Sequence, residues 1–71
     1  MLFDKNAFAA NLRAERGRCD VSQSELADKT GINIATISQY EDGAYVPGVD
    51  KICALANALG CTPNDLIGWN C

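Results

Sequence analysis

Histidine is absent from this 71-residue sequence, and its four cysteines include no C-x-x-C pair. Zinc sites usually draw on closely spaced Cys or His pairs, and a catalytic cysteine usually depends on a histidine base. No loop of the kind that cradles phosphates is present either. We therefore predict no metal site, no cofactor and no enzymatic activity. We expect reduced thiols without an intramolecular disulfide at Cys19, Cys53, Cys61 and Cys71.

Long hydrophobic runs are also missing. The apolar stretches are only a few residues long, far short of the roughly 20 residues that a membrane-spanning helix needs. Met1, Leu2 and Phe3 are followed at once by the charged Asp4, which is not the pattern of a signal peptide. We expect a protein that does not associate with membranes and that stays in the cytoplasm.

Basic residues are few. Six Lys and Arg side chains stand against nine Asp and Glu, which gives a net charge of −3, and residues 33–46 contain neither Lys nor Arg. Most nucleic-acid-binding domains lean basic, because neutralising phosphates supplies much of their affinity. The acidity argues against a nucleic-acid binder and is consistent with a module that binds another protein.

What the sequence does have is the apolar periodicity of helices. Its length suits one domain, its apolar share of 48% fits a folded chain, and no segment alternates like a strand. We predict a single all-α domain over residues 1–71. Its expected core is Phe8, Leu12, Val21, Leu26, Ala27, Ile32, Ile37, Val46, Ile52, Leu55, Ala56, Leu59, Cys61 and Leu66.

Capping residues predict where five helices begin and end. Ser22 and Glu25 have the spacing of a capping box, and Thr62 precedes a proline in the position that favours a helix start. The expected N-caps are Asp4, Ser22, Asn33 and Thr62, and the expected stops are Asp20, Gly31, Gly43 and Gly60. The buried face of the fourth helix is expected to run through Val49, Ile52, Cys53, Ala56 and Leu59.

The second and third of these helices are short and are joined by a turn with glycine, which predicts a helix-turn-helix over about residues 23–42. Three positions meet its physical demands. Ala27 is small where the helices cross, Gly31 can take a positive φ, and Ile37 is a branched apolar residue for the angle between them. Three constraints in register indicate this unit far more strongly than a helix, a glycine and a helix alone.

Further residues in register carry a resemblance to a known family. They are Leu12-Arg13-x-x-Arg16, Ser22-Gln23-x-x-Leu26-Ala27, Gly31-Ile32-Asn33, Thr36-Ile37-Ser38-x-Tyr40-Glu41-x-Gly43, Val46-Pro47, Ala56-x-x-Leu59-Gly60 and Leu66-Ile67. Over roughly residues 8–68 the sequence resembles the phage-repressor/Cro family, also called the xenobiotic-response-element type. The resemblance implies a compact five-helix, lambda-repressor-like DNA-binding domain whose third helix enters the major groove.

The resemblance also implies roles for particular residues. Gln23 would bond a phosphate, although it could instead only cap its helix, and Arg16 and Glu41 would form a structural ion pair rather than remain separate surface charges. For Ile34, contact with a thymine methyl and burial that closes the turn both remain open, and Gln39 is either an adenine contact or a solvated side chain. For Thr36 and Ser38, a base contact and a position on the helix surface without one both remain open. The residues that would face the groove are Asn33, Ile34, Ala35, Thr36, Ser38 and Gln39.

The function implied is that of a sequence-specific DNA-binding transcriptional regulator, a repressor of prophage or mobile-element origin. Its partner would be double-stranded DNA with a two-fold symmetric operator, bound by a homodimer. The alternative is a protein-interaction module, such as an antitoxin, that keeps the fold with little DNA affinity. For Trp69, a tail folded over the core and a dimer contact both remain open.

Overall fold

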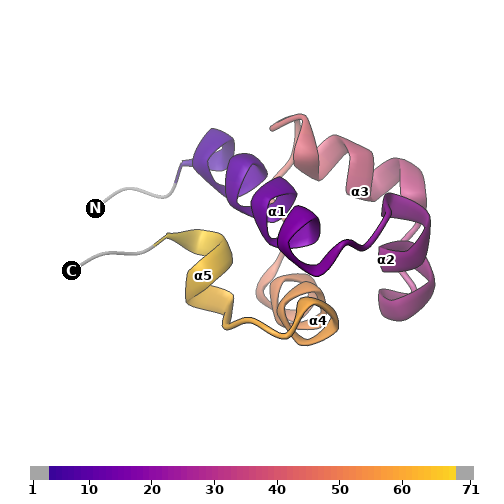
Figure 1. Cartoon of the computed structure of the whole chain (residues 1–71). Coiled ribbons are helices and arrows are strands. Elements are labelled where there is room, and N and C mark those ends of the chain that lie inside the picture. The colour runs from indigo at the N-terminus through magenta and orange to yellow at the C-terminus, as the bar shows by residue number, and fades with distance from the viewer. Residues whose placement is uncertain (1–3, 69–71) are drawn as a thin grey trace.

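Five helices follow one another along residues 4–68, the part of the chain that this computed structural model describes. They are α1 (Lys5–Cys19), α2 (Gln23–Thr30), α3 (Ile34–Glu41), α4 (Val49–Leu59) and α5 (Pro63–Ile67), and residues 4–68 include no strand (Figure 1). The all-α fold predicted from the sequence is confirmed. None of the helices in this part of the chain is long and apolar enough to cross a membrane. The expectations for Trp69 and Cys71 lie outside the described residues.

Local hydrogen bonds begin and end the helices close to the predicted positions. The Ser22 hydroxyl accepts from the Glu25 N–H at 3.0 Å, and the Glu25 carboxylate accepts from the Ser22 N–H at 3.2 Å, so the predicted capping box is present. Helix α1 ends at Asp20, which has a φ of +55° and is the one non-glycine residue of positive φ within residues 4–68. An aspartate tolerates this conformation less well than glycine does, yet α1 still ends where the sequence predicts.

Helices α1 and α4 each contact three other helices. Helix α1 contacts α3, α4 and α5, while α2 contacts α3 and α4. Figure 1 shows α1 crossing the molecule between α3 on one side and α4 and α5 on the other. The rings of Phe8 and Tyr40 meet edge to face, with centroids 6.4 Å apart, and join α1 to α3. Helix α3 is therefore held from its inner side by α1 and α2.

The core draws side chains from all five helices. Val21, Ala27 and Cys61, which were expected in it, are partly buried and pack against it. The fully buried side chains include Phe8, Leu12, Leu26, Ile37, Leu55 and Leu66.

Two apolar residues lie outside the positions expected of them. Val46, which was expected in the core, is 48% exposed, and Val49, the first of the periodic apolar positions of the fourth helix, is 77% exposed, so both predictions are wrong. Residues 45–48 have no regular structure, and Pro47 is the buried residue among them. Pro47, and not Val46, is the residue of this segment that packs inward, while Tyr45 and Val46 both remain exposed. Val49 is the first residue of α4, one turn before Ile52, where the buried face of that helix begins.

Candidate nucleic-acid interface

The turn between α2 and α3 has the geometry that the sequence predicts. Gly31 has a φ of +74°, and its N–H donates to the Ala27 carbonyl at 2.8 Å. A Cβ built on Gly31 would meet no atom within 4 Å, so the constraint at this position is the backbone conformation and not the space. Ala27 is half-buried at the crossing and Ile37 is fully buried behind it. These residues fix the angle at which α3 leaves the turn.

Helix α3 has one buried face and one exposed face. Ile37, Tyr40 and Glu41 are buried, and Thr36 and Ser38 lie half-buried at the border. Ile34 is 45% exposed, so the alternative in which it closes the turn as a core residue is wrong. The remaining residues expected to face a groove, which are Asn33, Ala35 and Gln39, are exposed.

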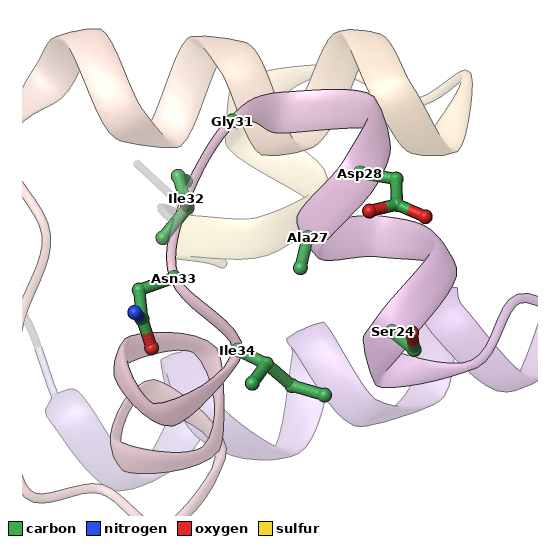
Figure 2. A pocket seen from close by; sticks show the side chains of 7 residues that line it. All are labelled: Ser24, Ala27, Asp28, Gly31, Ile32, Asn33 and Ile34. Carbon is green, nitrogen blue, oxygen red and sulfur yellow. The ribbon is translucent and has the colours of Figure 1, made fainter.

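An open hollow of about 490 Å³ lies between α2 and the start of α3. Figure 2 shows Ser24, Ala27 and Asp28 on the α2 side of it and Ile34 on the α3 side. Methyl groups of Ala27 and Ile34 give it an apolar part, while Asp28 adds a carboxylate at its border. The hollow suits an apolar group such as a thymine methyl better than it suits an anion.

The N-termini of α2 and α3 offer backbone donors. The capping box uses the N–H groups of Ser22 and Glu25, and the Asn33 side-chain oxygen accepts from the Ala35 N–H at 2.8 Å. These caps do not use the N–H groups of Gln23 and Ser24, the first two residues of α2. The first N–H groups of a helix have no intrahelical acceptor, and they carry a partial positive charge. Both helix starts can therefore take an anion without any cationic side chain.

The Glu41 carboxylate joins three helices at the other end of α3. It accepts from Arg16 Nε at 2.7 Å and from Arg16 Nη2 at 3.1 Å, and Arg16 also donates to the Val21 carbonyl at 3.1 Å. The ion pair implied by the resemblance is thus present, with a carboxylate only 4% exposed. The hydrogen bond to Glu41 raises the pKa of Arg16 above its ordinary value. This pair ties α1 and the loop before α2 to the end of α3.

Two further contacts at this junction were missed from the sequence. Gln23 Nε2 donates to Glu41 Oε1 at 3.1 Å, and Arg13 Nη1 donates to the Glu41 carbonyl oxygen. The phosphate contact expected of Gln23 stays a prediction, and it would use the second Nε2 hydrogen or the backbone N–H. No local pattern announces these bonds, because they join residues 18 and 28 positions apart.

The cysteines of the described residues, which are Cys19, Cys53 and Cys61, are free thiols. The part of the chain from 4 to 68 holds no group of three or more His, Cys, Asp or Glu suited to a metal ion. Cys19 Sγ donates to the Leu59 carbonyl at 3.0 Å and so helps to cap the end of α4. Burial raises the pKa of the Cys61 thiol, which makes it a weaker nucleophile at neutral pH.

Comparison with known proteins gives consistent matches. The profile of a family described as a helix-turn-helix domain matches residues 7–66. Repressor protein C2 of Salmonella phage P22 is 32% identical over 56 residues, which cover 79% of this chain and 26% of that protein. The cryptic phage CTXphi transcriptional repressor RstR of Vibrio cholerae is 28% identical over 57 residues, which cover 80% and 51% of the two chains. The chain thus spans about a quarter and about half of the length of these relatives.

Solved structures of similar proteins share the fold. The restriction-modification controller protein C.AhdI of Aeromonas hydrophila matches with a TM-score of 0.85 and 30% identity, over 89% of this chain and 96% of that one. The P22 c2 repressor, in a crystal structure with a synthetic operator, matches with a TM-score of 0.79 and 30% identity, over 84% and 91% of the two chains. In both comparisons nearly all of the solved chain corresponds to the five-helix unit described above.

Proposed function

The chain belongs to the helix-turn-helix domain family, in its phage-repressor or xenobiotic-response-element type, and from that premise we propose that it is a sequence-specific DNA-binding transcriptional repressor. The observation that carries the proposal is the outer face of α3. It exposes an apolar side chain, Ile34, and an amide side chain, Gln39, on a helix held rigidly by the Glu41 junction. The P22 relative's structure with an operator supports the same assignment.

In this proposal α3 lies in the major groove and reads the edges of bases. The Ile34 side chain and the Ala35 methyl contact thymine methyl groups, and the Gln39 amide bonds to an adenine. Thr36 and Ser38 are half-buried, so their hydroxyls reach only bases or phosphates close to the helix axis. The expected preference is for half-sites that contain A·T pairs.

Phosphates are bound mainly by neutral donors in this arrangement. The backbone N–H groups at the starts of α2 and α3, together with the side chains of Gln23 and Asn33, contact the two walls of the groove. Few counterions are displaced by such contacts. Affinity should therefore depend on salt less steeply than it does for a basic repressor.

We also propose that two copies bind a two-fold symmetric operator with half-sites about one helical turn apart. A single α3 of eight residues can contact only a few base pairs, so two copies are needed for a site that is rare in a genome. Residues 1–71 act here as one DNA-binding domain. In this proposal the protein has no enzymatic activity and binds its DNA in the cytoplasm.

The test is selection of bound duplexes from a random DNA pool, followed by fluorescence anisotropy on the enriched site and on a scrambled duplex. We expect a palindromic, A·T-containing consensus and binding at least 1,000-fold tighter to it than to the scrambled duplex, which is at the lower end for specific binders. If no sequence is enriched even at 50 mM salt, the repressor proposal is wrong.

A further inference from the structure

Arg13 is an exposed residue of α1 whose side chain reaches the end of α3. Its Nη1 donates to the Glu41 carbonyl oxygen, in the last turn of that helix. A guanidinium carries five N–H groups, and within residues 4–68 this is the hydrogen bond that the Arg13 side chain makes. That bond fixes the orientation of the Arg13 guanidinium and leaves its other N–H groups available to bond elsewhere.

The length of α3 indicates where this guanidinium would lie on DNA. Eight helical residues span about 12 Å, which is close to the width of the major groove at about 12 Å. When such a helix lies across the groove, its two ends come near the two phosphate walls. At the start of α3, the backbone N–H groups other than that of Ala35 have no acceptor within the helix and can face one wall, whereas the end of α3 presents carbonyl groups.

Electrostatics at the end of α3 would oppose a phosphate unless a cation were present. The C-terminus of a helix carries a partial negative charge, and exposed Asp42 follows it directly. Residues 33–46 supply no Lys or Arg to offset this charge. Arg13, which lies on α1, supplies the cationic side chain instead.

The local charge balance differs from that of the whole chain. Two guanidiniums, those of Arg13 and Arg16, are bonded to the single residue Glu41. Arg16 holds the carboxylate with two of its nitrogens and is mostly buried, with 25% of its side chain exposed. With Asp42 counted, two guanidiniums balance two carboxylates at this corner, so it is neutral in a molecule whose net charge is −3, and its more exposed cation is Arg13.

We propose that Arg13 binds a DNA backbone phosphate at the C-terminal end of α3 and supplies the cationic contact that α3 itself lacks. The Glu41 carbonyl positions the guanidinium, and the remaining N–H groups bond to the phosphate oxygens. The inference rests on the proposed DNA-binding function, and it adds one charged phosphate contact for each protomer to the neutral contacts described above.

The test measures how affinity for the selected duplex depends on salt. Fluorescence anisotropy between 50 and 200 mM KCl gives the slope of log affinity against log salt for the wild type and for Arg13→Gln, Arg13→Lys and Arg18→Gln. Each phosphate neutralised contributes about 0.9 to this slope. We expect Arg13→Gln to reduce its magnitude by about 2 for a dimer and to weaken binding on all sequences alike, while Arg13→Lys keeps most of the slope.

Arg18→Gln is the matched control, because Arg18 is an exposed arginine of the same helix that bonds to Glu15 and to the Leu59 carbonyl instead. It should leave the slope unchanged. If Arg13→Gln keeps the wild-type slope, or if Arg18→Gln lowers it equally, the phosphate contact is wrong while DNA binding by the wild type still stands. If the wild type binds no duplex, the proposed function fails and this inference fails with it.

Discussion

Glu41 is a buried ionised group whose burial is balanced by its partners. Removing a carboxylate from water costs several kcal/mol unless charge-assisted hydrogen bonds replace the lost solvent. Arg16 provides two such bonds and Gln23 provides a third. The carbonyl of the same residue receives Arg13. A single residue thus fixes how α1 and α2 meet the end of α3.

Replacing Glu41 with alanine should destabilise the protein by about 3 kcal/mol, because the substitution leaves the mostly buried Arg16 guanidinium without its counter-ion. Urea unfolding followed by circular dichroism measures the change. Glu15→Ala is the control, since it breaks a more exposed ion pair with Arg18 and should cost much less. A loss under about 1 kcal/mol for Glu41→Ala would contradict the structural importance of the junction.

Gln39 should determine one position of the operator. Truncating it to alanine removes the proposed amide contact with adenine and should lose about 1–3 kcal/mol on the selected site, with non-specific binding unchanged. Titration of single-base-pair variants of the site locates the loss. An equal loss on every sequence would show that Gln39 positions the protein without reading a base.

For the helices, the sequence predicts where they begin and end, but it does not predict the contacts between them. The capping boxes at Ser22 and Thr62 are set by residues three positions apart, so the sequence alone predicts those helix starts. The bonds from Gln23 and Arg13 to Glu41 depend on how three helices pack, which periodicity does not specify. The exposure of Val46 was missed for a related reason, because the direction of a loop depends on which neighbour is buried.

Helix α5 offers a pH test of one such cap. Hydrogen bonds from the backbone and side chain of Thr62 lower the pKa of Asp65 below its ordinary value of 3.8. Because the pKa of Asp65 is lower in the folded state than in the unfolded state, the cap stabilises the protein fully at pH values above the unfolded-state pKa. This stabilisation is lost as the pH falls through the folded-state pKa. Wild type should therefore be more stable than Asp65→Asn at pH 6, and the difference should shrink towards pH 2. A gap that stays constant over this range in urea unfolding would contradict the assignment.

For the whole molecule, the proposed function requires an acidic chain to bind a polyanion. The net charge of −3 gives no general attraction to DNA, so long-range steering towards it should be weak. In the proposed complex, affinity would come instead from shape, from backbone donors and from the few placed contacts at the ends of α3. Two copies on one site would double those contacts, so the proposed dimer would be more important here than in a basic repressor.

The exposed apolar residues indicate where two copies would meet. Tyr45, Val46 and Val49 are 57%, 48% and 77% exposed, and they lie within one short segment directly after α3. Contiguous exposed apolar side chains are typical of interfaces. Residues 43–49 carry no charge, so a two-fold axis through them would bring apolar side chains together, with the exposed Asp42 and Asp50 that flank the segment at the edge of the contact. The same axis would place the two α3 helices on either side of one interface.

Val49→Asp should therefore weaken self-association, because it would bury one carboxylate from each copy without a partner. Sedimentation equilibrium should show a dissociation constant raised at least tenfold, with the unfolding midpoint nearly unchanged since Val49 is exposed in the monomer. Ala10→Asp introduces the same charge at an exposed position of α1 and should leave association as in the wild type. On DNA, Val49→Asp should bind an isolated half-site as the wild type does and lose affinity only for the complete palindrome. Unchanged association of Val49→Asp would place the dimer interface elsewhere on the molecule.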